Sequence, residues 1–429
     1  MTNHMTTIGE IAQIYDGPHA TPKKTNIGPY FLSISSLDSG RLDLSKSAHL
    51  SEKDFITWTK RVTPQEGDLL FSYETRLGEA ALMPGGIKSC LGRRMGLLRP
   101  DPDRIISEYL LYEYLSPHFQ QIISQNTIVG ATVNRIALSE MSEYPIHVPP
   151  LAEQELISTL LVSIDKKIAL NNKINTELEA MAKLIYDYWF VQFDFPDANG
   201  KPYKSSGGKM VYNEALKREI PEGWSVEELN QCVDTILDHR GKTPKKLGGD
   251  WTDNDDGIIA LSAKLVKGGK LRNLEKANKV DRALFNKWMP EKLKDGDILM
   301  TSEAPAGEFY FIHGKTDYCM SQRLFGIRGK QELLAPTYLY YELSKGHGYS
   351  QILGSLSGST VFGIRQDVLR TIKVVVPELA LQKRFDEIVL PQLKQIKNLD
   401  QANIELSALR DWLLPMLMNG QVTVKDTAS

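Results

Sequence analysis

The sequence predicts an α+β protein with two tandem α+β domains, separated by two long helices that pair as an antiparallel coiled coil, in a pseudo-two-fold arrangement. Three observations predict this fold. The second half of the chain repeats the first. Each copy opens with short apolar runs separated by glycine, proline and aspartate, and each closes with a long helical pattern that has a seven-residue apolar period.

The internal repeat is visible in segments that follow one another in the same order. EGDLLFSYETRLGE, which begins at Glu66, matches DGDILMTSEAPAGE, which begins at Asp295. Further along, Val148 aligns with Val376, at an offset of 228 residues. The chain is therefore a duplication of a unit of about 225 residues, which is far longer than a solenoid repeat of about 20–45 residues.

The first part of each copy, residues 1–148 and 224–376, has the pattern of a mixed domain. Short β-rich runs such as DLLFSY, GIIALS, DILMTS and IKVVVP alternate with turn residues. One helix is expected in each part, around 108–116 and 336–344. We therefore expect two α+β domains with these boundaries.

The second part of each copy, residues 149–194 and 377–421, is expected to be a long helical spacer. In each helix, apolar and amide residues recur every seven positions, and a second such series lies one helical turn further along. This pattern is typical of coiled-coil packing. The residues expected to pair the helices are Ile157, Leu161, Ile164, Ile168, Asn175, Leu178, Phe385, Val389, Ile396, Leu399, Asn403 and Leu406. Asn175 and Asn403 occupy matching positions, where a buried amide can fix register.

An alternative is that each helix lies on its own domain as an unrelated amphipathic helix. A helix of roughly 40 residues extends about 60 Å, at a rise of about 1.5 Å per residue, which exceeds the width of a small domain. Part of each helix must then project, and the other helix is the obvious partner. Residues 195–223, rich in Gly, Pro, Ser and Lys, are expected to be the linker between the copies, and residues 422–429 a tail.

Composition indicates an ordinary soluble protein. No apolar run approaches the roughly 18 residues of a spanning helix, and the first residues lack a secretion-signal pattern, so we expect a cytoplasmic location without a membrane. Cys90, Cys232 and Cys319 stand far apart without a CxxC pair, which argues against a zinc site or a disulfide framework and favours buried thiols.

The net charge of -2 gives no global sign of nucleic acid, but residues 239–287 carry a local surplus of six positive charges. A solvated lysine-rich surface would explain that surplus equally well.

Sequence signatures of catalysis are missing. No complete P-loop, GxGxxG, HExxH or GxSxG motif occurs, and the Asn/Asp-Pro-Pro-aromatic loop of an amino-methyltransferase is not found. We therefore expect no catalytic centre and no metal site in this chain. A nuclease centre made of dispersed carboxylates and a lysine is the alternative that a single sequence leaves open.

A duplicated pair of domains on paired helices would suit a protein that grips two short sites on one DNA duplex, with the helices setting their spacing. The tetrapeptide Thr-Pro-Lys-Lys occurs in both copies, at 21–24 and 243–246, and offers hydroxyl groups and cations to phosphates or bases. Arginines are further candidates, because arginine takes guanine through two hydrogen bonds. The expected DNA-binding residues are Thr21, Lys23, Lys24, Arg76, Arg93, Arg94, Arg135, Thr243, Lys245, Lys246, Arg323 and Arg365. An exposed turn, or an ion-paired surface arginine, is the structural alternative at each position.

Several stretches together resemble one known family. The most specific is YDYWFVQFDFPDANGKPYKSSGGKMVYNEALKREIPEGW, from Tyr186 to Trp224. A domain-ending pattern also occurs twice, as Gly130, Thr132, Ile136, Pro149, Pro150, Leu151, Glu153 and Gln154, and as Gly358, Thr360, Ile364, Pro377, Leu379 and Gln382. The chain resembles the specificity subunit of Type I restriction-modification systems over essentially its whole length. Leu381 stands where the first copy has Glu153, and the first domain lacks the Ile-Pro-Glu-Gly-Trp start.

The resemblance implies recognition of an asymmetric bipartite site in double-stranded DNA. It also implies two modification subunits, which carry S-adenosylmethionine and methylate adenine, and restriction subunits, which translocate and cut DNA with ATP and Mg²⁺. The helices would dock the modification subunits, and none of these cofactors would be bound by this chain. The alternatives are a stand-alone sequence-specific DNA-binding protein, which the near-neutral charge disfavours, and the nuclease mentioned above.

Overall fold

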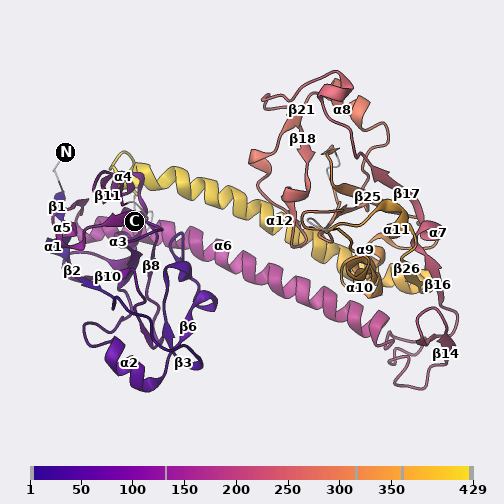
Figure 1. The fold of residues 1–429 in the computed structure, drawn as a ribbon, viewed down its shortest axis with the longest axis horizontal. Coiled ribbons are helices and arrows are strands. Elements are labelled where there is room, and N and C mark those ends of the chain that lie inside the picture. The colour runs from indigo at the N-terminus through magenta and orange to yellow at the C-terminus, as the bar shows by residue number, and fades with distance from the viewer. Residues whose placement is uncertain (1–3, 131–132, 315–316, 359–361, 425–429) are drawn as a thin grey trace, which may run out of the picture. The chain divides into compact units, whose positions relative to one another are not determined.

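A computed structural model of the 429-residue chain describes residues 4–130, 133–314, 317–358 and 362–424. The chain divides into two compact units, which are described separately. Unit 1 consists of Met1–Asn171 and Gln401–Ser429, and unit 2 consists of Asn172–Asp400. Each unit contains one globular domain, here called head 1 (1–148) and head 2 (224–376), and a portion of both long helices, α6 (Leu151–Tyr186) and α12 (Leu379–Met418) (Figure 1).

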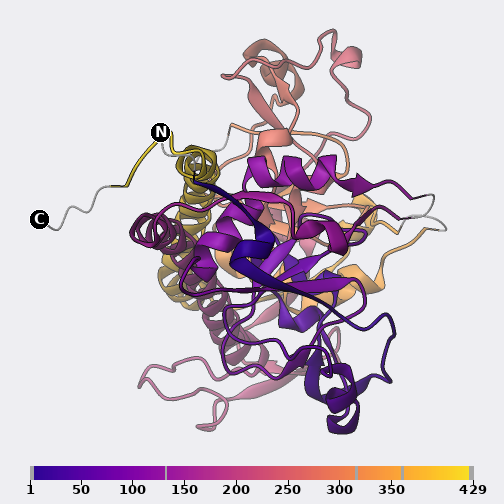
Figure 2. The same cartoon turned by 90° about the vertical axis from the view of Figure 1, so that its left-hand side faces the viewer.

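Head 1, the indigo to purple domain that faces the viewer in Figure 2, is built on a four-stranded antiparallel sheet. The strand order is β2 (Ala12–Asp16), β10 (Met95–Pro100), β7 (Leu69–Ser72) and β8 (Ala80–Leu82). All four residues of β7 are buried. Because side chains alternate between the faces of a strand, Leu69 and Phe71 enter one core with α3 (Ser107–Leu115) and α4 (Pro117–Gln125), whereas Leu70 enters a second core on the other face. The sheet is thus covered on both faces.

Smaller elements complete head 1. A three-stranded sheet has the order β6 (Ala48–His49), β3 (Thr25–Phe31), β9 (Ser89–Cys90), and it lies next to α2 (Glu52–Trp58). Three two-stranded pairs are β4 (Leu37–Asp38) with β5 (Arg41–Leu42), β11 (Thr127–Ile128) with β12 (Arg135–Ile136), and β1 (Met5–Thr7) with β13 (Pro145–His147). The last pair joins the two ends of head 1 just before α6 begins. Short helices are α1 (Ile8–Ile11) and α5 (Leu138–Met141).

Head 2 has the same topology in the same order. Its four-stranded sheet is β17 (Val233–Asp238), β25 (Leu324–Gly329), β22 (Ile298–Thr301) and β23 (Phe309–Phe311), and its three-stranded sheet is β21 (Lys279–Val280), β18 (Ile258–Leu261) and β24 (Cys319–Met320). The matching pairs are β19 (Val266–Lys267) with β20 (Lys270–Leu271), and β16 (Ser225–Glu228) with β26 (Lys373–Val376). Its helices are α7 (Leu229–Cys232), α8 (Arg282–Trp288), α9 (Pro336–Ser344), α10 (His347–Gly354) and α11 (Gln366–Arg370). The duplication seen in the sequence therefore extends to the fold.

A buried glutamine explains the recurring motif at the start of each long helix. The side-chain amide of Gln154 donates to the carbonyl oxygen of Pro149 at 2.7 Å and accepts from the backbone of Ile106 at 2.9 Å. Gln382 makes the equivalent contacts with Pro377, at 2.7 Å, and Ala335, at 2.9 Å. Each glutamine thus ties its helix to the segment before α3 or α9. The Thr132 and Thr360 positions of the domain-ending pattern lie outside the described residues.

The two long helices pair in unit 1. Arg410 of α12 donates to Asp165 of α6 at 2.9 Å, and the Asn171 amide donates to the Asn403 side-chain oxygen at 2.8 Å. Because the residue number rises along α6 while that of the partner falls, the helices run antiparallel. Leu417 lies in the core of head 1, together with Ile157 and Leu161.

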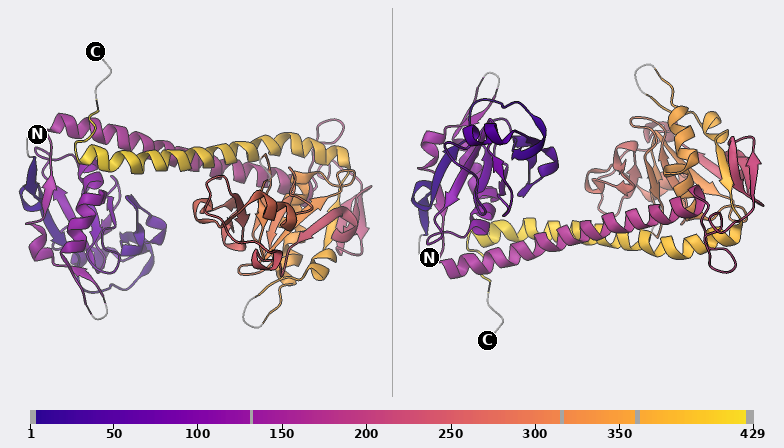
Figure 3. Two further views of the ribbon diagram at one scale, coloured as in Figure 1. Left: turned by 90° about the horizontal axis from the view of Figure 1, so that it is seen from above. Right: turned by 90° about the horizontal axis from the view of Figure 1, so that it is seen from below.

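The helices also pair antiparallel in unit 2. The Asn175 amide donates to Asp400 at 2.9 Å, and Tyr186 and Trp189 pack on Phe385, with ring centroids 6.2 Å away. The α+β fold with antiparallel paired helices is therefore confirmed (Figure 3). Among the residues expected to pair the helices, Leu178, Leu399, Asn403 and Leu406 are partly exposed, and the others are buried.

The segment 195–223 differs from the expected linker. It contains an antiparallel hairpin of β14 (Met210–Asn213) and β15 (Arg218–Pro221), and Ile220 is buried in the core of head 2. The Phe195 ring stacks on Trp224 with a centroid separation of 5.4 Å. Burial of these apolar side chains anchors the segment, so it is part of unit 2 despite its Gly- and Ser-rich composition.

The three cysteines are buried and free, as expected. Cys90 and Cys319 occupy equivalent strands, β9 and β24, and burial raises the pKa of each thiol to about 12. Both are therefore neutral hydrophobic side chains near neutral pH. Within the described ranges, none of the helices combines the length and the apolar character that crossing a membrane requires.

Candidate nucleic-acid interface

In head 1, the Thr-Pro-Lys-Lys loop follows β2 directly. Thr21, Lys23 and Lys24 are exposed, whereas Pro22 between them is buried and anchors the loop. At the start of this loop, the Gly17 N–H donates to the Met95 carbonyl at 2.9 Å. The loop therefore begins beside the turn between β9 and β10.

That turn carries two of the expected arginines. Arg93 is exposed and makes no hydrogen bond or ion pair with any described residue. Arg94 has a positive φ of 73° and pairs through its Nε with Glu74 at 2.9 Å. Arg135, which is exposed, forms a backbone bridge with the same Glu74. The structure thus brings Arg94 and Arg135 together at Glu74, in the turn after β7, with Arg93 next to Arg94 in the chain.

Arg76 is different from the other expected arginines. Its guanidinium donates to the carbonyl oxygens of Ile34 at 3.1 Å and Leu37 at 2.9 Å, and to Glu79 at 2.8 Å. These bonds tie the start of the β4–β5 hairpin to the turn before β8. These bonds give Arg76 a structural role inside head 1, and because its side chain is still 39% exposed, its contact with DNA stays a prediction.

Head 2 contains an open groove of about 1070 Å³. Its lining residues are cationic or carry amide and hydroxyl groups, around apolar walls that include two tryptophans. The cations are Lys242, Lys245, Lys264, Lys276 and Arg323, and a single carboxylate, Asp250, also lines the groove. The neutral polar groups belong to Thr243, Ser262, Asn273, Asn278, Ser321 and Gln322. Cations suit phosphates, and amides and hydroxyls suit base edges, so the groove has the chemistry of a DNA-reading surface.

The second Thr-Pro-Lys-Lys loop lies on this groove, but its two lysines differ. Lys246 Nζ donates to the Gly241 carbonyl at 2.9 Å, and the Lys246 N–H donates to the Thr243 hydroxyl at 3.3 Å. Lys245 is exposed, and its ammonium has no partner among the described residues. Lys245 is thus the cation of this loop that is free to meet a phosphate.

Arg323 and Arg365 occupy different places in head 2. Arg323 lines the groove and pairs through its Nε with Glu303 at 2.8 Å, as Arg94 pairs with Glu74 in head 1. Arg365 precedes α11, is exposed beside Asp367 at 3.5 Å, and does not line the groove.

Sequence reasoning missed Lys242, Lys264 and Lys276 as site residues. They come from separate segments around β18, and a backbone bridge between Thr252 and Lys279 helps to hold this region together. The only sequence signal was the local surplus of positive charge in 239–287. Burial, followed by the charge of Lys242, lowers the pKa of His239 to about 4, so this nearby imidazole is neutral.

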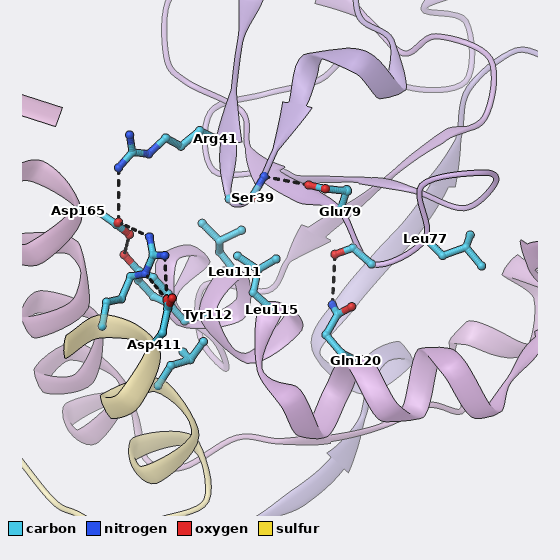
Figure 4. Close-up of a pocket in the computed structure, with 14 residues that line it drawn as sticks. Ser39, Arg41, Leu77, Glu79, Leu111, Tyr112, Leu115, Gln120, Asp165 and Asp411 are labelled. Atoms are coloured by element: carbon cyan, nitrogen blue, oxygen red, sulfur yellow. Dashed lines mark hydrogen bonds and ion pairs between the residues drawn. The ribbon is translucent and has the colours of Figure 1, made fainter. Parts of the chain in front are cut away.

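A polar cluster fixes head 1 to the helices of unit 1 (Figure 4). Asp165 of α6 accepts from the Tyr112 hydroxyl at 2.7 Å and from Arg410 of α12 at 2.9 Å, and Arg41 of β5 lies 3.5 Å away. These residues line a cavity of about 360 Å³. Burial, followed by the bond to Asp165, raises the pKa of the Tyr112 hydroxyl, so this hydroxyl remains a donor.

Unit 2 has a comparable anchor with different residues. Lys270, on the hairpin that matches the one carrying Arg41, lies 2.9 Å from Asp400 of α12 and 3.7 Å from Glu179 of α6. Each head is therefore held on its helices by a charged hairpin residue. Among the described residues, no group of three or more His, Cys, Asp or Glu side chains is placed to hold a metal ion.

The duplicated α+β heads, the paired helices and the basic groove define a DNA-recognition protein built from two similar domains. Comparison with known proteins agrees. The family described as the Type I restriction modification DNA specificity domain matches residues 2–180 and 221–407. The chain belongs to this family, and it is a specificity subunit of a Type I restriction-modification system.

Two relatives and one solved structure illustrate the similarity. A Methanocaldococcus jannaschii protein, provisionally named type I restriction enzyme MjaX specificity subunit, is 27% identical over 425 residues, covering 96% of this chain and 91% of the relative. The MjaIX specificity subunit of the same organism is 23% identical, covering 88% and 82%. The crystal structure of the Type-I restriction-modification system S subunit from M. genitalium has a TM-score of 0.61 at 15% identity, covering 96% of this chain and 95% of that one. That likeness shows a shared fold.

Proposed function

We propose that this chain recognises an asymmetric bipartite site in double-stranded DNA, with one half-site read by each head. The observation that carries the proposal is that the heads share a topology but present different residues. Head 2 has a groove with Lys242, Lys264 and Lys276, whereas head 1 offers Lys23 and Arg93 beside its sheet. Different surfaces on the same scaffold would read different bases.

The paired helices would dock the catalytic partners. Large apolar side chains remain exposed on both helices outside their mutual seam, among them Leu184 (66%) and Met181 (52%) of α6, and Ile404 (59%) and Trp412 (56%) of α12. Exposed apolar surface of this kind favours protein partners. We assign two modification subunits to these helices, with restriction subunits joining the complex.

The chemistry would belong to those partners. In this proposal the chain is non-catalytic, and S-adenosylmethionine, ATP and Mg²⁺ are bound by the modification and restriction subunits. The complex would act in the cytoplasm, where the cell's DNA is methylated. Incubation of the purified chain with DNA and Mg²⁺ tests whether the chain is non-catalytic, and cleavage of the DNA without partner subunits would refute that part of the proposal.

Exchange of a single head tests the proposed division of labour. Head 2 (224–376) is replaced by the corresponding head of another specificity subunit, and genomic methylation is mapped in cells that carry the complete system. We expect one half-site to change and the other to be retained. The reciprocal exchange of head 1 (1–148) is the matched control and should change the other half-site. A change in both half-sites, or in neither, would contradict the proposal.

Lys245→Ala is expected to weaken DNA binding by the methyltransferase complex by a similar factor for cognate and unrelated duplexes. The free ammonium of Lys245 suits a phosphate, and losing one phosphate contact reduces the slope of log K against log salt concentration by about 1. Binding titrations at several salt concentrations measure this slope. Lys201→Ala, on the exposed segment before β14, is the control and should leave the slope unchanged. An unchanged slope for Lys245→Ala would remove this lysine from the interface.

A further inference from the structure

Trp251 is an exposed aromatic residue on the wall of the head 2 groove. Its side chain is 42% exposed, although tryptophan is among the side chains that gain most from burial. Its ring centroid lies 6.0 Å from that of Trp288, which is buried, and the planes are tilted by 42°. The indole therefore rests on the domain on one side while remaining open to the groove.

The segment that carries Trp251 is specific to the second copy. Both copies return to equivalent strands, because Phe31 pairs with Cys90 as Ala260 pairs with Cys319. Between the Thr-Pro-Lys-Lys loop and those strands, the second copy has seven additional residues, as the change of offset from 222 to 229 requires. In head 1 the corresponding stretch is strand β3 itself, which carries the exposed aliphatic Ile27 and the half-buried Tyr30, whose ring lies on His49 with a centroid separation of 4.6 Å.

Backbone bonds hold the additional segment in place. The Thr252 N–H donates to the Lys279 carbonyl at 2.9 Å, which attaches the residue after Trp251 to strand β21. The Trp251 N–H donates to the Asp250 carboxylate, also at 2.9 Å. The backbone directly after Trp251 is therefore tied to β21, which restricts the segment before a ligand binds and lowers the conformational entropy lost on binding.

The surroundings of Trp251 indicate what that ligand is. Lys245, Lys264 and Lys276 line the same groove and make no hydrogen bond or ion pair with other described residues. Asn273 and Asn278 add amides that can bond the edge of a base. An aromatic face among free cations and amides matches a nucleotide, whose phosphate is anionic and whose base has a π-face.

We propose that Trp251 stacks on a base that is displaced from the duplex in the half-site read by head 2. In an intact duplex each base face is covered by its neighbours, so an indole reaches a face only where one base leaves the stack. This contact makes recognition of the second half-site depend on deformation of the DNA. Head 1 has no residue equivalent to Trp251, so its half-site does not require this contact. The inference rests on the proposed function, because it requires head 2 to read a half-site.

A double-mutant cycle tests this stacking contact. Once methylation mapping has supplied the site, the methyltransferase complex with wild-type chain or Trp251→Ala is titrated with the intact duplex and with duplexes that lack one base at each position in turn. We expect Trp251→Ala to weaken binding of the intact duplex by about tenfold. At one position of the second half-site, removal of the base should abolish this difference between wild type and variant. At every position of the first half-site the difference should persist.

Two further variants separate stacking from a general loss of structure. Trp251→Phe keeps an aromatic face and should retain most of the affinity, and Tyr212→Ala removes another exposed aromatic of unit 2, 59% exposed, and should change nothing. The inference is overturned if Trp251→Ala loses the same affinity for every duplex, including those that lack a base, or if it loses no affinity at all. If the exchange of head 2 leaves both half-sites unchanged, the proposed function fails instead, so the two failures are distinguishable.

Discussion

Leu417→Ala is expected to destabilise unit 1 by about 2–5 kcal/mol, the usual cost of removing a buried leucine side chain from a core. Leu417 is 1% exposed and lies near the end of α12, yet it belongs to the core of head 1. Its neighbour Met418, 2% exposed, enters the same core. The last turn of the chain's final helix therefore completes the domain formed by the first residues.

Hydrogen exchange, followed separately for peptides of each head, measures this effect. Peptides from β7 and β10 of head 1 should lose protection in Leu417→Ala, whereas those from β22 and β25 of head 2 should change little. Leu409→Ala, on the same helix but 44% exposed, is the matched control and should cost less than about 1 kcal/mol. Equal loss of protection in both heads would show that the cores are not independent in the way that the two units suggest.

In unit 2, too, the end of one copy's long helix packs in the head of the other copy. Tyr186 and Trp189, at the end of the first copy's helix, lie in the core of head 2 together with Phe385. Each head is thus completed by the helix that belongs to the other copy of the repeat. A change at the end of α12 should therefore disturb head 1, which is distant in sequence, and a change at the end of α6 should disturb head 2, which follows that helix in the chain.

Much of this architecture could be predicted from the sequence because duplication makes the signal visible twice. The seven-residue period of 149–194 and 377–421 predicted the paired helices, and the period is maintained by residues that are buried, such as Ile164 and Val389. The hairpin in 195–223 was missed because its Gly- and Ser-rich composition is typical of a linker. Its order depends on Ile220 packing in a core formed by distant residues, which composition does not report.

The candidate site was less predictable than the fold. The tetrapeptide at 243–246 identified one part of the groove, but Lys264 and Lys276 reach it only because the chain folds back around β18. Arg76 was predicted to contact DNA from its residue type alone, and the structure adds that it bonds Ile34 and Leu37 inside the domain. A residue's partners decide such cases, and they follow from tertiary contacts that a single sequence does not contain.

Glu113 gives the second prediction with a large expected effect. It lies on α3 in head 1, and its side chain is 1% exposed. One carboxylate oxygen lies 3.5 Å from the His147 backbone N–H, which donates to it, and 3.9 Å from His118 Nδ1, while the other has no partner among the described residues. Burial raises the pKa of Glu113 from 4.5 to about 8, because the charged form loses its water.

The raised pKa makes the stability of head 1 depend on pH. Between about 4.5 and 8 the folded domain holds a proton on Glu113 that the unfolded chain releases. The contribution of the protonated Glu113 to the free energy of unfolding is therefore complete below pH 4.5 and is lost as the pH rises through 8. The loss amounts to up to about 1.4 kcal/mol per pH unit. Glu113→Gln, which is neutral at every pH, is expected to remove this dependence and to become more stable than the wild type near pH 8.

Urea unfolding at pH 5, 6, 7 and 8, followed through the exchange of head 1 peptides, measures the free energy of unfolding of that domain. Glu108→Gln changes an exposed glutamate on the same helix and should keep the slope of the wild type. His118→Gln separates the imidazole from the carboxyl, because only a charged His118 would stabilise an ionised Glu113. If Glu113→Gln and the wild type lose stability in parallel between pH 5 and 8, Glu113 is ionised in the folded domain and its burial does not control the titration.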